Sequence, residues 1–329
     1  MSNSTAQLAG TKDLPPELKG GVVAIGNFDG IHRGHRAVLD RALEEAHQYG
    51  CPALALTFEP HPRTFFRPQT PVFRLTPPPL KRELLAELGF DAVIEQSFDA
   101  AFAAQTAHDF VGKVLVADLG VTHVIAGHDF HFGKGREGTP DFLKAEAASR
   151  AFGVDLVEPL TDEGGDVISS SRIRALLGRG DVAGATALLG HRHAVEARVD
   201  GGQKLGRTLG FPTANMVLPP EYGLAHGIYA VRLRRADGSL HHGVASFGRR
   251  PTVEENGRAL LETHLFDFDG DLYGEECTVA FFAFLRGEEK FDSLEALTEQ
   301  MRHDAAEARA ALSGVTPLSE LDNFLSFEA

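Results

Sequence analysis

The sequence predicts a protein of two domains, an α/β domain with a parallel sheet followed by a small antiparallel β domain with a closing helix. In the first half, short apolar segments alternate with helical patterns, which is typical of right-handed βαβ units. In the second half, alternating strand patterns follow one another through short turns with no helix between them. The chain has 329 residues, a length that accommodates about two domains.

The first domain is expected over residues 20–190. Five short apolar segments predict its parallel strands, at residues 21–25, 52–58, 91–94, 122–126 and 154–160. Helical patterns lie between them, for example over residues 80–88 and 101–119. Residues 1–19 are polar and contain two consecutive prolines, so we expect them to form a disordered tail.

The second domain is expected over residues 191–329. Residues 228–235 alternate apolar and charged side chains and lead through Asp237-Gly238 into another strand pattern, which indicates a hairpin. A second hairpin is predicted around Asp269-Gly270, and repeated hairpins of this kind build an antiparallel barrel or sandwich. Residues 294–312 have the pattern of one amphipathic closing helix.

The composition excludes several classes of protein. The net charge of −14 argues against a duplex nucleic-acid partner, because such surfaces carry a basic stripe. No apolar run reaches the roughly 18–20 residues that span a bilayer, so we expect no transmembrane helix. Residues 1–19 lack the apolar core of a signal peptide, so we expect a cytoplasmic protein. Cys51 and Cys277 are too few for a disulfide framework or a cysteine metal site, and both are expected to be buried thiols.

The strongest motif is Gly26-Asn27-Phe28-Asp29-Gly30-Ile31-His32-Arg33-Gly34-His35, between the first strand and the first helix. Open α/β sheets bind ligands at this edge, where glycines allow close backbone approach and the helix start offers free N–H groups to an anion. His32 and His35 can share one face of the first helical turn and stabilise charge on a polyphosphate. The alternative is a pair of surface histidines beside a tight turn.

Two further segments are expected at the ligand edge of the same domain. Residues 168–174 either cap a helix or form a mobile phosphate clamp. The candidate clamp residues are Ser170, Ser171, Arg172 and Arg174. At the end of the second strand, Phe58 is either core or a contact for an aromatic ligand, and Pro60 keeps that edge rigid.

In the second half, two elements carry candidate chemistry. Residues 206–215 combine glycines with Thr213 and Asn215, whose oxygens suit Mg²⁺, although a turn entering a strand explains the same pattern. Glu262 shares a predicted strand face with the largely apolar set Leu260, His264, Phe266 and Phe268. A carboxylate there can serve as a general base, and the alternative is an edge-strand glutamate that faces solvent.

These motifs together resemble the bacterial bifunctional riboflavin kinase/FAD synthetases, over about residues 21–312. The first half is similar to HIGH-type nucleotidyltransferases at residues 26–35, 57–62, 127–133 and 169–174. The second half is similar to riboflavin kinases at residues 209–215, 248–252, 262–267, 272–274, 284–286 and 290–291.

The resemblance implies a Rossmann-like FMN adenylyltransferase domain followed by a riboflavin kinase β-barrel with a C-terminal helix. The barrel would phosphorylate riboflavin to FMN, and the first domain would join FMN to AMP from a second ATP, giving FAD and pyrophosphate. His32, His35 and Glu262 are the expected catalytic residues, and Thr213 and Asn215 are expected to hold Mg²⁺ with ATP. The expected binding residues are Asn27, Phe28, Gly30, Phe58, Pro60, Asp129, Ser170, Ser171, Arg172, Arg174, Gly206, Arg207, Gly210, Pro212, Asn215 and Arg250.

Two departures from the family pattern stand out, Ser246 where asparagine is expected and Asp129 where some relatives carry asparagine. We expect neither to touch the catalytic groups. The expected partners are riboflavin, FMN, FAD and ATP, with no nucleic acid or membrane, in a monomer or weak homo-oligomer. The alternatives are a single-activity FAD synthetase with a non-catalytic flavin-binding C-terminal domain, and a flavin sensor without turnover. Retention of every expected catalytic residue argues against both.

Overall fold

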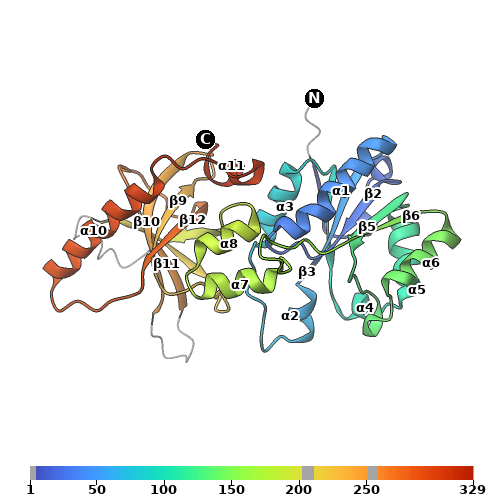
Figure 1. The fold of residues 1–329 in the computed structure, drawn as a ribbon, viewed down its shortest axis with the longest axis horizontal. Helices are drawn as coiled ribbons and strands as arrows, with labels where there is room; N and C mark the ends of the chain where they lie inside the picture. The colour runs from blue at the N-terminus through green and yellow to red at the C-terminus, as the bar shows by residue number, and fades with distance from the viewer. Residues whose placement is uncertain (1–4, 202–210, 251–257, 329) are drawn as a thin grey trace. The chain divides into compact units, whose positions relative to one another are not determined.

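The computed structural model describes residues 5–201, 211–250 and 258–328. These form two compact units, which we describe separately (Figure 1). The first unit comprises Met1–Val72 and Pro78–Ile168, and the second comprises Phe73–Pro77 and Ser169–Ala329. The spatial division therefore falls earlier in the chain than the expected boundary at residue 190. The segment that follows Ile168 belongs to the second unit because it is hydrogen-bonded to other residues of that unit. For example, the N–H of Ala225 donates to the carbonyl of Leu177.

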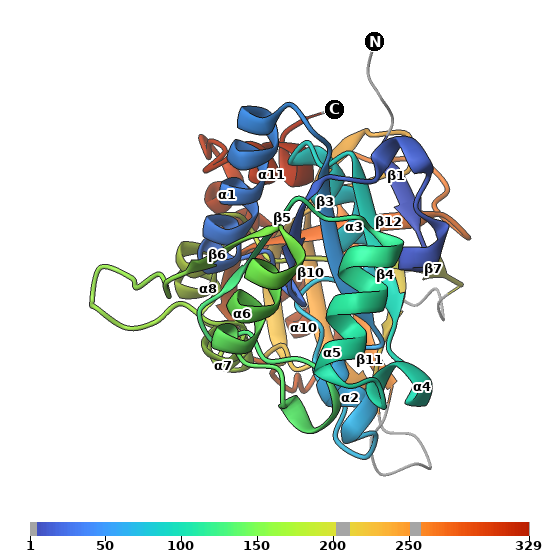
Figure 2. The same cartoon turned by 90° about the vertical axis from the view of Figure 1, so that its right-hand side faces the viewer.

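The first unit contains a six-stranded sheet in the order β1-β4-β3-β2-β5-β6, in which every pair is parallel (Figure 2). This confirms the predicted parallel sheet. All four residues of β2 are buried, so its two faces are both covered, as expected where crossover helices flank a parallel sheet. The strands are β1 (Ala6–Leu8), β2 (Val22–Ile25), β3 (Ala53–Glu59), β4 (Ala92–Ser97), β5 (His123–Gly127) and β6 (Gly153–Val157).

Helices connect these strands as the sequence predicts, with one difference. The pattern over residues 101–119 is interrupted where the side chain of Thr106 accepts a hydrogen bond from the N–H of Asp109 and so starts a new helical segment. A π-helix over Phe110–Asp118 follows. The α-helices are α1 (Arg33–Tyr49), α2 (Pro62–Phe66), α3 (Pro78–Glu87), α4 (Ala100–Ala103), α5 (Ala107–Asp109) and α6 (Pro140–Arg150).

The expectation of a disordered tail is wrong for residues 5–19. Strand β1 extends the sheet by pairing with β4, where Ala6 lies opposite Ala92. Leu14 is buried in the core, and the hydroxyl of Thr11 lies 2.7 Å from a carboxylate oxygen of Asp118. The segment is polar on average, but its few leucines are spaced so that each one packs against the sheet.

The second unit contains a closed six-stranded barrel in the order β10-β11-β8-β7-β12-β9, with antiparallel pairing throughout. The predicted small antiparallel barrel is confirmed. The strands are β7 (Ala194–Asp200), β8 (Thr213–Leu218), β9 (Gly227–Arg234), β10 (Leu240–Arg250), β11 (Arg258–Leu265) and β12 (Glu276–Arg286). The helices are α7 (Ser170–Gly178), α8 (Val182–Leu189), α10 (Leu294–Leu312) and α11 (Glu320–Ser326).

The barrel interior follows the two-residue alternation of its strands. In β11, Leu261, Thr263 and Leu265 are buried, whereas Glu262 and His264 are only partly buried. The predicted closing helix is α10, which packs on the outside of the barrel through residues that include Ala308 and Leu312.

Both cysteines are free thiols, as expected. Cys277 is buried, but Cys51 is only partly buried because it follows the end of α1 rather than lying inside a strand. Within the described residues, no helix combines the length and apolarity needed to cross a membrane.

Candidate active sites

The loop that follows β2 is held in an unusual conformation. Phe28 and Ile31 have positive φ angles of 47° and 39°, a region that non-glycine residues rarely occupy. Both side chains are fully buried, so packing compensates for the strain. A side chain at Gly26 would lie within 2.7 Å of the Phe28 ring, which explains why glycine is required there. The loop is thus a fixed turn that leads into the start of α1.

His32 and His35 lie together at the N-terminus of α1, as their spacing predicts. Their rings are stacked with centroids 3.6 Å apart, and the backbone N–H of His35 donates to Nδ1 of His32. In the neutral His32 ring, the hydrogen is therefore on Nε2, which can act as a donor. The edge of Phe28 packs against His35 at 5.6 Å. A helix N-terminus with two adjacent imidazoles is suited to binding a polyphosphate.

The neighbouring strand end holds a hydrogen-bond network that sequence reasoning missed. The hydroxyl of Thr57 donates to the backbone carbonyl of Asn27, and Lys81 donates to both Thr57 and Glu59. Oδ1 of Asn27 is buried without a hydrogen-bond partner among the described residues. The one available signal was Lys81 itself, a charged residue in the apolar helical pattern of Leu80, Leu84 and Leu85.

Aromatic rings gather at the same edge of the sheet. Phe58 is nearly buried and contacts Phe98 and Phe102, with ring centroids 6.1 and 5.8 Å apart. Phe65 and Phe66 of α2 extend this group outward, and Phe66 is 64% exposed. Phe58 is therefore part of the core and also the base of an aromatic surface that reaches solvent. Pro60, which follows β3, is exposed.

The remaining predicted residues of the adenylyltransferase site lie elsewhere in the chain. Asp129 follows β5, and its side chain is 82% exposed. Ser170, Ser171, Arg172 and Arg174 belong to α7 in the second unit. The side chain of Ser169 caps this helix by accepting from the N–H of Arg172, and the side chain of Arg174 donates to the carbonyl of Phe73.

The predicted kinase residues lie on adjacent strands of the barrel. Glu262 of β11 is the direct cross-strand partner of Asn215 in β8 and of Ser246 in β10. Cross-strand partners point to the same face, which here is the outer one. His264 is likewise opposite Thr213. Ser246, one of the two departures from the family pattern, is thus the cross-strand neighbour of Glu262 in the register of β10 and β11.

The hydrogen bonds on this face orient Thr213 and Asn215. The side-chain N–H of Asn215 donates to the carbonyl of Thr213 at 3.1 Å, which directs the amide oxygen away from that carbonyl. Nδ1 of His264 lies 2.9 Å from the carbonyl of Pro212, an exposed residue, and donates to it when it carries the hydrogen. A hydroxyl and an amide oxygen beside a carboxylate are hard oxygen donors, so the residues present fit Mg²⁺.

A cavity of about 500 Å³ lies at this end of the barrel. Its lining residues come from β7, β8, β11 and the loop that follows β11. They are Val199, residues 212–215, Thr263, Leu265 and residues 268–273. The predicted Gly206, Arg207 and Gly210 lie outside the described residues, as does the side chain of Arg250.

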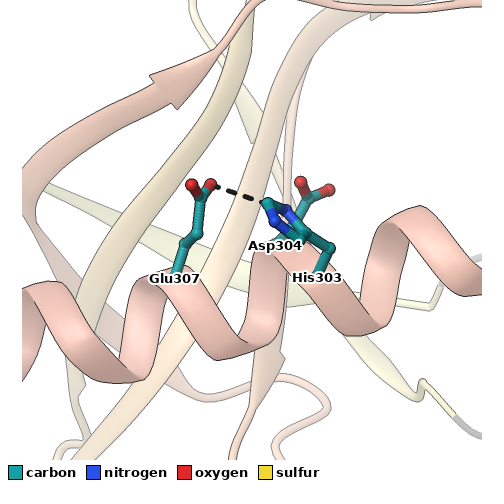
Figure 3. A group of neighbouring side chains, drawn as sticks. All are labelled: His303, Asp304 and Glu307. Atoms are coloured by element: carbon teal, nitrogen blue, oxygen red, sulfur yellow. Dashed lines mark ion pairs between the residues drawn. The ribbon is translucent and has the colours of Figure 1, made fainter.

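Within the described part of the chain, one other group of three side chains has metal-ligand chemistry, His303, Asp304 and Glu307 on α10 (Figure 3). Asp304 is buried and accepts hydrogen bonds from Arg286 at 2.8 and 2.7 Å and from Gln300 at 2.9 Å. Both oxygens of Asp304 thus already pair with the partly buried guanidinium of Arg286, so the group does not fit a metal ion.

These features define a transferase in which a nucleotidyltransferase domain with a parallel sheet precedes a small kinase barrel. The FAD synthetase family matches residues 14–172, and the riboflavin kinase family matches residues 189–312. The chain belongs to the bifunctional riboflavin kinase/FMN adenylyltransferase family. Matches to both domains favour two activities over the alternative of a single-activity FAD synthetase.

Several curated relatives carry this bifunctional name. The relative from Pseudomonas fluorescens is 43% identical over 303 residues, which are 92% of this chain and 96% of the relative. The relative from Escherichia coli K12 is 42% identical over 88% of this chain and 92% of its own length. The relative from Bacillus subtilis is 35% identical over 87% of this chain and 91% of its own length.

A solved structure from Streptococcus pneumoniae is similar to most of this chain. It is 31% identical with a TM-score of 0.81 and covers 93% of this chain and 99% of its own. It carries the name "macrolide-efflux protein", which describes that protein and does not transfer to this one.

Proposed function

We propose that this chain converts riboflavin to FMN and then FMN to FAD, with the first reaction on the barrel and the second at the parallel sheet. The observation that carries the proposal is that each unit holds its own group of candidate residues. The second unit pairs Glu262 with Asn215 across two strands, and the first unit stacks His32 on His35 at a helix start.

In the kinase reaction, Glu262 accepts the proton of the riboflavin 5′-hydroxyl as that oxygen attacks the γ-phosphorus of ATP. A bond from the hydroxyl oxygen to phosphorus forms, the bond between the γ-phosphorus and the bridging oxygen breaks, and ADP leaves. Thr213 and Asn215 would hold Mg²⁺, which when bound offsets the charge of the ATP phosphates. The position of Glu262 next to these oxygens supports its role as the base.

The cavity beside Thr213 and Asn215 is the proposed place of the nucleotide in the kinase unit. Its lining combines the apolar side chains of Val199 and Leu265 with polar groups such as those of Thr213 and Asn215, as is common in cofactor and nucleotide sites.

In the adenylyltransferase reaction, a phosphate oxygen of FMN attacks the α-phosphorus of a second ATP. The new bond joins FMN to AMP, the bond between the α-phosphorus and the bridging oxygen breaks, and pyrophosphate leaves. His32 and His35 donate to the phosphate oxygens as charge develops, and no covalent enzyme intermediate is needed. The buried Oδ1 of Asn27 supports a role in accepting a hydrogen bond from the nucleotide.

The aromatic surface at Phe58, Phe65 and Phe66 supports a place for the flavin ring in this unit. An exposed phenylalanine next to a catalytic edge offers a flat apolar contact for a tricyclic ring. Asp129 is proposed as a further nucleotide contact of this unit. Ser170, Ser171, Arg172 and Arg174 are proposed as a phosphate-binding segment of the second unit, in α7.

We place the enzyme in the cytoplasm, acting on small molecules as a monomer or weak homo-oligomer. The test is a time course with purified protein, riboflavin and Mg-ATP, followed by chromatography. FMN should form first, with one ADP for each FMN, and FAD should follow together with pyrophosphate. Chelation of divalent cations before ATP is added should stop FMN formation. Absence of FMN in a folded protein with Mg²⁺ present would refute the kinase assignment.

A further inference from the structure

Lys81 is a fully buried lysine on α3, at 0% exposure. Its neighbours on the helix are the buried apolar residues Leu80, Leu84 and Leu85. Burial of an ammonium group is costly unless the charge is paired and hydrogen-bonded, so a specific set of partners must keep Lys81 in this place.

The partners of Lys81 lie on the carboxyl end of β3. Nζ donates to Oε1 of Glu59 at 2.7 Å and to the hydroxyl of Thr57 at 3.0 Å. A lysine ammonium has no acceptor, so the Thr57 oxygen must accept this bond and direct its own hydrogen elsewhere. That hydrogen goes to the carbonyl of Asn27, 3.1 Å away. The network thus has a defined direction, from α3 through β3 to the loop after β2.

The loop that receives this last hydrogen bond is the strained one. Asn27 directly precedes Phe28, whose φ angle is 47°, and Ile31 follows at 39°. Residues in such conformations persist only when their surroundings hold them in several ways at once. The same loop leads to His32, which caps α1. A change in the Asn27 carbonyl position would therefore be passed on to the two histidines.

From this geometry we infer that Lys81 is a positioning residue of the adenylyltransferase site, which acts through Thr57 to fix the loop that carries Asn27 and His32. It does not touch substrate, because its side chain is fully buried. The inference deepens the proposed function and rests on its placement of FMN adenylylation at this loop.

The test uses three variants of the full-length protein, Lys81→Met, Thr57→Val and the double variant. Each single change should lower kcat for FAD formation from FMN by about tenfold to a hundredfold, with a smaller change in KM. Both substitutions break the same network. The loss of kcat in the double variant should therefore be close to the loss in Lys81→Met and smaller than the product of the two single losses. FMN formation from riboflavin should stay within twofold of the parent, because that reaction belongs to the second unit. The melting temperature and circular dichroism of each variant show whether the first unit is folded.

Leu84→Ala provides a matched control on the same helix. It opens a cavity in the core and should lower the melting temperature while leaving kcat for FAD formation within twofold. The inference is overturned if Thr57→Val keeps the parental kcat, if the two losses multiply, or if Leu84→Ala loses as much activity as Thr57→Val. If Lys81→Met does not fold, the comparison of kcat for FAD formation between Thr57→Val and Leu84→Ala still tests the inference.

His32→Ala, measured in parallel, separates this inference from the proposed function. If His32→Ala loses FAD formation and Thr57→Val forms FAD at the parental rate, the positioning role of Lys81 is refuted and the proposed function stands. Parental FAD formation in folded His32→Ala would instead show that the site itself is placed wrongly.

Discussion

Glu262 and Asn215 are direct cross-strand partners in β11 and β8, so the carboxylate and the amide leave the barrel on the same outer face. Ser246 flanks the carboxylate on its other side, in β10. A carboxylate between an amide and a hydroxyl can be held in one orientation while its oxygen remains available to a substrate proton. The proposed catalytic group of the kinase is thus placed by the register of β11, which is paired with β8 on one side and with β10 on the other.

Glu262→Gln should lower riboflavin phosphorylation by roughly 10²–10⁴-fold, because it retains the size of the side chain but removes the base. FAD formation from supplied FMN should remain, since that reaction belongs to the other unit. Both rates can be followed by chromatography of the flavins. Parental phosphorylation by this variant would place the base elsewhere, with His264 as the next candidate.

Replacing His32 and His35 with alanine should abolish FAD formation from FMN and leave riboflavin phosphorylation intact. Removal of one preorganised donor typically costs about 10²–10³ in rate, so FAD formation from FMN should fall at least that far. FMN formation from riboflavin should continue near the parental rate, because it belongs to the second unit, and circular dichroism of the variant shows whether the first unit is folded. An unchanged adenylylation rate in the folded double variant would rule out the assigned role.

Asp322→Ala should strongly destabilise the second unit. The buried Asp322 carboxylate pairs with the Arg192 side chain and also accepts from the backbone N–H groups of Arg192 and Leu318, at 2.8 and 2.9 Å. Its loss leaves a buried guanidinium without its counter-charge, which typically costs about 3–5 kcal/mol in the free energy of unfolding.

Denaturant titration of the full-length variant measures this decrease in the free energy of unfolding of the second unit. Glu299→Ala is the control, since its pair with Arg302 is largely exposed and should contribute at most about 1 kcal/mol. Equal effects of the two substitutions would show that α11 does not depend on the buried pair.

Cys277 should be unreactive in the folded protein. Burial raises the pKa of the Cys277 thiol to about 12, from an ordinary value of 9.0. At pH 8 a thiol reagent should therefore modify the partly buried Cys51 first and reach Cys277 only after unfolding. Above pH 9 the unfolded chain releases this proton before the folded one does, so stability should fall as pH rises from about 9 to 12. Rapid modification of both thiols in the native state would contradict this.

The sequence predicts the elements that depend on local pattern. Two-residue alternation in residues 260–264 correctly places Glu262 on the face opposite Leu261, and apolar segments between helical patterns correctly predict the parallel sheet. The spacing of His32 and His35 predicts that they lie together, but their stacking also depends on the extended N-cap conformation of His32, whose Nδ1 accepts from the N–H of His35.

Features that depend on distant partners could not be predicted in this way. Strand β1 has three residues and is stable because it pairs with β4, more than 80 positions later. The place of Ser246 beside Glu262 depends on the register of two strands, which spacing along the chain does not determine. Lys81 is buried because Glu59 and Thr57 meet it from another strand, so its role is visible only in three dimensions.

The most direct test of two separate active sites is a mixing experiment with full-length variants. Glu262→Gln retains only the FMN adenylyltransferase activity in this account, and the His32→Ala/His35→Ala variant retains only the kinase activity. Given riboflavin and Mg-ATP, neither variant alone should form FAD at a substantial rate, whereas the mixture should form it from released FMN. FAD formation by either variant alone at the parental rate, or none from the mixture of two folded proteins, would contradict the account.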